Sequence, residues 1–181
     1  MTAAIVDIDG AGEARLPRFV RLAVPRLAIE PEHRLLEIGC GGGTAVAAVA
    51  ARLTTGHILA IDRSAAAVTR ALRRNAEHIA RGVAEVRQVD LAQLTVDDGS
   101  FDTVFALNVN LFLGPDPSIV DIIRRALRPR GRLVLGYWRR DPRQLVGRAE
   151  RTSAALEAGG LPVPALDWAS PEHLFLTTTA R

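Results

Sequence analysis

The sequence predicts a doubly wound α/β domain, in which helices cover both faces of a mostly parallel sheet. Short apolar runs that suit buried strands alternate along the chain with longer stretches of helical composition. Strands separated by helices are joined by right-handed crossovers, which make neighbouring strands parallel. No repeat, low-complexity tract or linker divides the 181 residues, so we expect a single domain over 1–181.

The apolar runs define six expected strands, and the stretches between them define the helices. The first helical segment lies within residues 1–30, where Pro25 interrupts it. Ser64 is a candidate N-cap for a helix over 65–80, and Gly159 ends the last helix, over 142–160. The expected strands are 34–39, 57–62, 84–90, 101–107, 132–138 and 173–181, and the remaining helices are 44–53 and 117–127.

Bulk composition narrows the class of protein. The chain is 48% hydrophobic and 24% charged, and its single cysteine excludes an intramolecular disulfide. All its basic residues are arginine, the net charge is only +3, and the arginines are interleaved with acids, which argues against a nucleic-acid surface. The N-terminus lacks a secretory signal pattern and no run approaches ~18 apolar residues, so we expect a cytoplasmic protein without a membrane span.

The first expected strand leads into a glycine-rich turn, EIGCGGGT over residues 37–44. Glycine lets the chain turn sharply and lets a ligand approach the backbone, and the free N–H groups of the next helix can meet an anionic group. The dinucleotide spacing G-x-G-x-x-G, counted from Gly39, needs a glycine at position 44, where Thr44 stands. The carboxylate of Glu37 favours a ligand with positive charge, such as S-adenosylmethionine, over the pyrophosphate of NAD.

Polar residues stand at the ends of the next three expected strands, where parallel sheets bind their ligands. Asp62 can accept hydrogen bonds from both hydroxyls of a ribose, each worth about 1.5–3 kcal/mol. Asp90 can accept from the exocyclic amine of adenine while the backbone of Leu91 meets a ring nitrogen. Asn108 stands where a transferred group and its acceptor would meet. The alternative interpretations are an acid at a helix N-terminus for Asp62 and a loop aspartate for Asp90.

Taken together, these segments resemble the class I S-adenosylmethionine-dependent methyltransferases. LLEIGCGGGT, ILAIDRS, VRQVDL, FDTVFALN and LRPRGRLVLGY occur in the order and spacing of that family, from about residue 16 to the C-terminus. The resemblance implies a Rossmann-like, seven-stranded, mostly parallel sheet whose last strand is antiparallel. It also implies S-adenosylmethionine as the cofactor and S-adenosylhomocysteine as its product.

The resemblance further implies a cofactor-binding role for nine residues. Glu37, Gly39, Cys40 and Gly41 hold the methionine end, Asp62 holds the ribose, Arg63 lies over the adenine, Asp90 and Leu91 read the adenine edge, and Asn108 lines the site beside the methyl donor. The residue after the ribose acid is often apolar in the family, but the guanidinium of Arg63 can stack on a purine. No metal is expected, because the chain lacks the paired acids and asparagine of metal-dependent catechol-type enzymes.

The sequence also restricts the methyl acceptors that we expect. The fourth strand lacks the Asx-Pro-Pro-aromatic signature for amide or base nitrogens, and Cys40 in the glycine turn is badly placed to attack a pyrimidine. We expect residues 1–30, the loop 108–116 and residues 137–140 to build the acceptor side, and none of the four histidines is identified as a general base. Three aromatic residues could form an apolar wall of that pocket, or they could fill the hydrophobic core: Phe19, Phe112 and Trp138.

The functional hypothesis is in-line methyl transfer to a small-molecule acceptor without a metal. Two alternatives stay open: a non-catalytic S-adenosylmethionine-binding module that regulates or scaffolds a partner, and an RNA or protein methyltransferase. The chain has little beyond the bare domain, so the acceptor is small or a second subunit of a homodimer supplies a lid.

Overall fold

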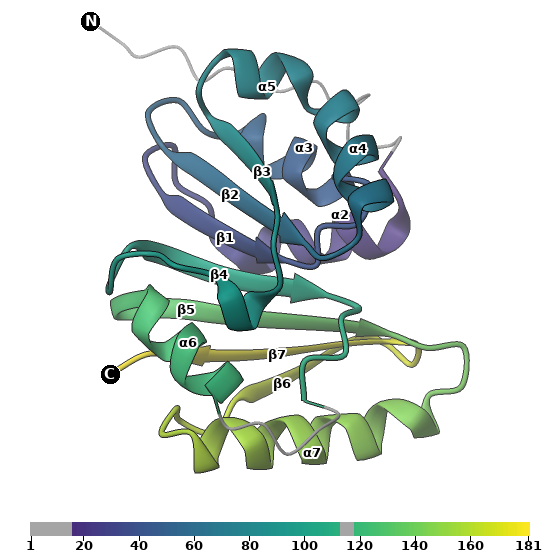
Figure 1. The fold of residues 1–181 in the computed structure, drawn as a ribbon. Coiled ribbons are helices and arrows are strands. Elements are labelled where there is room, and N and C mark those ends of the chain that lie inside the picture. The colour runs from purple at the N-terminus through teal and green to yellow at the C-terminus, as the bar shows by residue number, and fades with distance from the viewer. Residues whose placement is uncertain (1–15, 113–117) are drawn as a thin grey trace, which may run out of the picture.

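A computed structural model describes residues 16–112 and 118–181 and shows a seven-stranded sheet with helices on both faces (Figure 1). The strand order is β3-β2-β1-β4-β5-β7-β6. The strands are β1 (Arg34–Ile38), β2 (His57–Asp62), β3 (Ala84–Gln88), β4 (Phe101–Leu107), β5 (Leu127–Trp138), β6 (Ala165–Ser170) and β7 (His173–Thr179). The helices are α2 (Arg18–Ala23), α3 (Thr44–Ala50), α4 (Ala65–Arg74), α5 (Ala76–Ala80), α6 (Ser118–Ala126) and α7 (Arg143–Ala158), with 3₁₀ turns η1 (Val24–Leu27) and η2 (Leu91–Gln93).

The direction of the strands confirms the predicted fold class. β3, β2, β1, β4 and β5 run parallel to one another, whereas β7 is antiparallel to both β5 and β6. The order reverses at β1, because the chain moves outward through β2 and β3 and then returns to β4 on the other side. The carboxyl ends of the parallel strands therefore meet at one edge of the sheet, on the right of Figure 1, which is where such sheets bind ligands.

Two hydrophobic clusters, one on each face, fix the sheet between its helical layers. Successive residues of a strand point to opposite faces, so in β1 Leu35 packs with the layer of α2 to α5, and Leu36 packs with the layer of α6 and α7. Both side chains are fully buried. Near-continuous apolar sequence in β1, β2 and β4 is thus explained by burial on both faces.

Three elements differ from the sequence-based expectation. The pattern gave no strand at 165–170, where β6 forms an edge strand with mostly exposed side chains. β5 begins at Leu127 and not at 132. Leu127 pairs with Phe101 of β4 and Arg132 pairs with Thr103, so the register shifts between these two pairs and the segment around Pro129 and Gly131 forms an irregularity within the strand. The helix expected over 65–80 is broken into α4 and α5.

The break between α4 and α5 is explained by the side chain of Asn75. It is completely buried, and its Nδ2 donates to the carbonyl oxygens of Gly43 (3.0 Å) and Ala71 (2.9 Å). Gly43 has φ +73°, and a Cβ there would contact both Asn75 and Ala71. The residue at the helix break therefore holds the end of the glycine turn against α4.

We expect Asn75→Ala to lower the free energy of unfolding by about 2–3 kcal/mol, because it removes two buried hydrogen bonds, to the carbonyls of Gly43 and Ala71. Urea denaturation monitored by circular dichroism measures this change. Asn75→Asp keeps the size of the side chain but removes the amide donor, so it should be at least as destabilising. A wild-type stability for Asn75→Asp would contradict the assignment.

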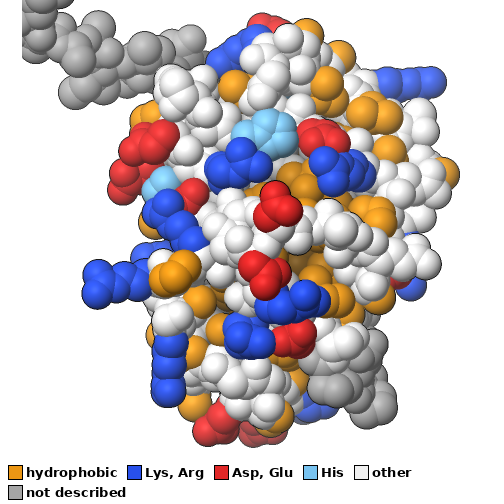
Figure 2. All heavy atoms as spheres, turned by 60° about the vertical axis from the view of Figure 1, so that its left-hand side comes forward, with side chains coloured by type: hydrophobic (Ala, Val, Ile, Leu, Met, Phe, Trp, Pro, Cys, Tyr) orange, Lys and Arg blue, Asp and Glu red, His pale blue; other side chains and the backbone are white. Residues whose placement is uncertain are grey.

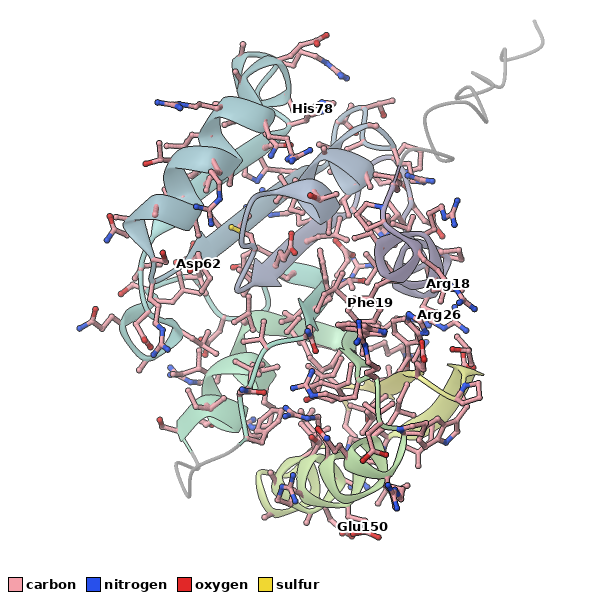
Figure 3. All side chains as sticks on the ribbon, turned by 90° about the vertical axis from the view of Figure 1, so that its right-hand side faces the viewer. Arg18, Phe19, Arg26, Asp62, His78 and Glu150 are labelled. Atoms are coloured by element: carbon pink, nitrogen blue, oxygen red, sulfur yellow. The ribbon has the colours of Figure 1, made fainter. Side chains whose placement is uncertain are left out.

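The described part of the N-terminal segment packs beside β7 (Figure 3). The ring of Phe19 stacks on Phe175 at 5.7 Å, and the guanidinium of Arg26 lies 4.5 Å from the centroid of the Phe175 ring. Arg26 also pairs with Asp167 on β6, at 2.6 Å. These contacts attach the N-terminal segment to β7 and β6. Residues 1–15 lie outside the described range, so a contribution of the whole segment 1–30 to an acceptor site stays a prediction.

Charges of both signs are interspersed over the face shown in Figure 2, which brings forward the side opposite the carboxyl ends of the strands. No extended area of one sign is visible on that face. None of the helices within residues 16–112 and 118–181 has the length and hydropathy that a bilayer span requires.

Candidate active site

A cavity of about 430 Å³ lies at the carboxyl edge of the sheet, over the point where the strand order reverses. This volume is within the range of small-molecule sites. The lining comes from the ends of β1 to β4, the segments that follow them, and α6. The residues are Ile38, Gly39, Ile61, Asp62, Arg63, Val89, Asp90, Leu91, Asn108, Val109, Asn110, Leu111 and Ile119.

The structure brings six of the nine predicted site residues to the cavity wall, whereas the other three, Glu37 in β1 and Cys40 and Gly41 in the glycine turn, do not line it. Those on the wall are Gly39, Asp62, Arg63, Asp90, Leu91 and Asn108. Glu37 and Cys40 are buried and Gly41 is partly buried. Binding of a cofactor by these residues stays a prediction. Val109, Asn110 and Leu111 fall in the loop expected on the acceptor side, whereas Ile119, on α6, was not among the predicted site residues.

Asp62 connects the glycine turn to the start of α4. Its Oδ2 accepts from the backbone N–H of Gly41 at 2.9 Å, and its Oδ1 accepts from the N–H of Ser64 at 2.9 Å. Ser64 in turn caps α4 by accepting from the N–H of Ala67, which confirms the predicted N-cap. A carboxylate offers about four lone-pair sites, so Asp62 is fixed in position by the backbone and retains acceptor capacity toward the cavity.

Glu37 is a buried carboxyl group without a complete set of partners. It is 3% exposed, and its Oε2 has no hydrogen-bond partner within the described residues. Burial, reinforced by the negative charge of Asp62, raises the pKa of Glu37 to about 8. A buried ionised carboxylate is stable only when it is paired, so this position is suited to a positively charged group.

The glycine turn is held close to the loop that follows β4. Gly39 has φ +73°, and a Cβ at this position would lie 2.5 Å from Cγ2 of Val109. The N–H groups of Gly39 and Cys40 both donate to the carbonyl of Ile61, at 2.8 and 3.0 Å. Burial and the charges of Glu37 and Asp62 raise the pKa of the Cys40 thiol to about 12. Cys40 is therefore a packed thiol and not a nucleophile.

We expect Gly39→Ala to destabilise the fold by about 2–5 kcal/mol, from the left-handed backbone and from overpacking against Val109. Gly41→Ala is the matched control, since Gly41 has φ +54° but no atom within 4 Å of an added Cβ. Gly41→Ala should therefore lose only about 1–2 kcal/mol. In a double-mutant cycle measured by urea denaturation, Val109→Ala should recover the excess of Gly39→Ala, and no recovery would refute the contact.

Asp90 and Leu91 stand at the end of β3. The Oδ1 of Asp90 accepts from the N–H of Ala92 at 3.0 Å, which caps the short turn η2. Leu91 is buried while still lining the cavity, and Arg63 is exposed at its rim. Asp90 thus caps η2, a role that the sequence did not predict, and its second carboxylate oxygen remains available to a ligand.

Asn108 adopts a left-handed backbone conformation, φ +61°, which asparagine tolerates better than most residues. Its N–H donates to the carbonyl of Gly136 at 2.7 Å, so the end of β4 is fixed to β5. Its Oδ1 accepts from the guanidinium of Arg139 and from the N–H of Trp138. The side chain of Asn108 is therefore joined to the residues that follow β5, on the side expected for the acceptor.

Two of the three aromatic residues considered for the acceptor pocket pack against different hydrophobic clusters, one on each face of the sheet. Phe19 packs with the cluster on the α2 to α5 face, and Phe112 packs with the cluster on the α6 and α7 face. Trp138 is 39% exposed at the end of β5. The core interpretation therefore holds for the first two, and these three residues do not form one wall.

A metal-binding cluster and a histidine at the cavity are both absent from the described residues. No group of three His, Cys, Asp or Glu side chains that could hold a metal ion occurs in the part of the chain that the structure describes. His173 is the first residue of β7 and lies at the same edge of the sheet, because β7 is antiparallel. Its side chain is buried: the ring centroid lies 5.7 Å from that of Phe19, and Nδ1 is hydrogen-bonded to Oγ of Ser170 at 2.7 Å. No histidine lines the cavity.

The fold and the glycine turn define a Rossmann-like α/β domain of the S-adenosylmethionine-dependent methyltransferase type. The chain matches the methyltransferase domain family over residues 36–133, more than half of its length. The chain belongs to that family. The matched region begins in β1 and ends in β5, so it includes every element that forms the cavity.

Solved structures share the fold at low sequence identity. An S-adenosylmethionine-dependent methyltransferase from Aquifex aeolicus superimposes with a TM-score of 0.77 at 16% identity, over 90% of this chain and 89% of that chain. A geranyl diphosphate C-methyltransferase from Streptomyces coelicolor, in complex with Mg²⁺, geranyl diphosphate and S-adenosylhomocysteine, gives a TM-score of 0.71 at 14% identity, over 90% and 79% of the two chains.

One curated protein is similar in sequence, an uncharacterised 37.1 kDa protein of a transposon from Streptomyces fradiae. It is 33% identical over 111 residues, which are 61% of this chain and 31% of the relative. The chain thus spans about a third of the length of the curated relative that it matches.

Proposed function

We propose that the protein binds S-adenosylmethionine in the cavity at the carboxyl edge and transfers its methyl group to a small-molecule acceptor without a metal. The observation that carries this proposal is the buried carboxyl of Glu37, unpaired at Oε2 and beside Asp62. Two acids behind a glycine turn favour a ligand with fixed positive charge and disfavour a pyrophosphate.

The residues present fit this cofactor. Glu37 would pair with the ammonium of the methionine end, next to the turn formed by Gly39, Cys40 and Gly41. Asp62, already oriented by two backbone N–H groups, would accept from the ribose hydroxyls. Four further residues line the same cavity: Arg63 would lie over the adenine, Asp90 and Leu91 would read its edge, and Asn108 would lie beside the sulfonium.

The bound cofactor supplies an electrophilic methyl group, so the chain has to bind, orient and exclude water. Val109, Leu111 and Ile119 contribute apolar side chains to the cavity lining. Holding the acceptor in line with the methyl group can contribute roughly 7–11 kcal/mol through proximity alone. Among the described residues that line the cavity, Asp62 and Asp90 are the only carboxylates, and both are assigned to the cofactor. The acceptor would therefore arrive with a free lone pair or as an anion.

The cavity volume of about 430 Å³ supports a small-molecule acceptor, and the Streptomyces coelicolor protein, a geranyl diphosphate C-methyltransferase, shares the fold. Because the fold contains one buried free cysteine and no disulfide, we place the reaction in the cytoplasm. Nucleic acid and membrane are not proposed as partners, and a homodimer that completes the acceptor side stays within the proposal.

Calorimetric titration tests the binding step directly. S-adenosylhomocysteine should bind with a micromolar or lower dissociation constant, and NAD at the same concentrations should not bind. A screen of pooled metabolites with S-adenosylmethionine, with Asp62→Ala as the inactive control, tests turnover. Cofactor binding without any methylated product across the screen would favour the non-catalytic module, and binding of NAD alone would refute the proposal.

A further inference from the structure

The cavity is lined by acids on one side, with Arg63 beside them, and by two asparagines on the other. Its acids, Asp62 and Asp90, come from the ends of β2 and β3, with Glu37 behind them at β1. On the other side, beyond the end of β4, the polar residues Asn108 and Asn110 line the cavity. Each of these two asparagines accepts a hydrogen bond from an arginine, Arg139 after β5 or Arg148 on α7, so two guanidinium groups stand next to this part of the lining.

Both arginines are held by neutral oxygens. Nη1 of Arg139 donates to Oδ1 of Asn108 and to the carbonyl oxygen of Trp138. Nη1 of Arg148, on α7, donates to Oδ1 of Asn110 at 2.6 Å. A guanidinium has five N–H donors, so these bonds fix the direction of each side chain and leave several donors for another group.

Nearby acids do not neutralise this pair. Among residues 16–112 and 118–181, no carboxylate forms an ion pair with Arg139 or Arg148. Asp141, the next acid along the chain, pairs with Arg143 at 3.2 Å. Glu150, the acid nearest to Arg148 on α7, lies on the side of that helix turned away from the sheet (Figure 3).

Arg148 is also partly removed from water. It is partly buried, and its guanidinium lies 5.0 Å from the centroid of the Tyr137 ring, whose side chain is buried. Burial lowers the pKa of Arg148, and the positive charge of Arg139 lowers it further. Two like charges that influence each other, and that have no carboxylate partner within the described residues, gain stability when an anion binds to both.

We propose that the methyl acceptor carries a carboxylate or phosphate group, and that Arg139 and Arg148 bind it at the Asn108–Asn110 side of the cavity. This inference rests on the proposed function, because it assigns the acceptor of the same site. Arginine suits the role, since its planar fork of donors matches the oxygens of either anion. The acids would then face the cationic cofactor, and the arginines would face the anionic end of the acceptor.

The test titrates three matched probes into the protein saturated with S-adenosylhomocysteine: benzoate, phenyl phosphate and neutral benzyl alcohol. Two-dimensional NMR of the arginine Nε–Hε groups reports on the individual side chains, at constant ionic strength. We expect saturable shifts of the Arg139 and Arg148 signals with benzoate, with phenyl phosphate or with both, and none with benzyl alcohol. The stronger of the two anions identifies the acceptor group.

A variant of Arg148 tests whether the anion binds to this arginine pair. Arg148→Gln should weaken anion binding at least tenfold and change the affinity for S-adenosylhomocysteine less than twofold. Arg81→Gln is the matched control, because Arg81 is an exposed arginine in the turn between α5 and β3, and it should leave anion binding unchanged.

The outcomes separate this inference from the proposed function. If S-adenosylhomocysteine binds and neither anion shifts the two signals, the anionic acceptor is refuted and the cofactor site stands. Equal binding of benzyl alcohol and benzoate, or an unchanged affinity in Arg148→Gln, refutes it as well. The same titrations without S-adenosylhomocysteine judge the arginine site if the cofactor itself fails to bind, a result that would overturn the proposed function.

Discussion

Replacing Asp62 with alanine is expected to weaken the binding of S-adenosylhomocysteine by roughly 100-fold or more. Two hydrogen bonds from ribose hydroxyls to a charged acceptor are together worth about 3–6 kcal/mol. The same change removes the acceptor of the Gly41 and Ser64 N–H groups, so the glycine turn also loses its connection to α4. Isothermal titration calorimetry measures the affinity, and urea denaturation measures the accompanying loss of stability.

The control separates charge from position. Asp62→Asn keeps one carbonyl oxygen and nearly the same shape, so we expect it to retain more affinity than alanine but less than the wild type. Asp97→Ala removes an exposed aspartate between η2 and β4, and it should bind the ligand like the wild type. Wild-type affinity in Asp62→Ala, with the fold intact, would show that the nucleoside binds elsewhere.

The second large effect concerns the pH dependence of stability. The pKa of Glu37 is raised from 4.5 to about 8 in the folded protein. Between these values the folded state keeps a proton that the unfolded state has released, so the free energy of unfolding falls as the pH rises through this window. The slope from this one group reaches up to about 1.4 kcal/mol per pH unit. Urea denaturation of the ligand-free protein at pH 5, 6, 7 and 8 measures it.

Glu37→Gln should remove this slope, because the amide does not titrate, and the variant should gain stability over the wild type as the pH approaches 8. Glu32→Gln changes an exposed glutamate and should keep the wild-type slope. A cationic ligand favours the ionised form of Glu37, so binding near pH 7 should release a proton. Calorimetry in buffers of different protonation enthalpy detects that proton, which should be absent in Glu37→Gln. Parallel pH profiles of Glu37→Gln and the wild type would contradict the assignment.

The sequence predicted the parts of the fold that depend on local pattern. β1, β2 and β4 are short apolar runs because both of their faces are buried, and this signal is strong. β6 was missed because Leu166 and Trp168 are exposed and Asp167 pairs with Arg26, so its residues carry no burial pattern. Its place in the sheet depends on pairing with β7, which is information that one strand does not contain.

Long-range hydrogen bonds explain the other differences. Asn75 lies in a segment of helical composition, and its contact with Gly43 joins residues 32 positions apart, so the break could not be derived from the segment alone. The predicted cofactor residues were located by a simple rule, since strand ends of a parallel sheet converge. Arg148 was missed for the opposite reason: it lies within a helix, and only the packing of α7 brings it to Asn110.

The antiparallel direction of β7 has a practical consequence for handling the protein. β7 starts at the ligand-binding edge with His173 and carries the chain back across the sheet, so Arg181 emerges at the opposite edge, on the left of Figure 1. An affinity tag or a surface-immobilisation linker fused after Arg181 would point away from the cavity. Biosensor measurements on protein captured in this way should leave the pocket open to solution.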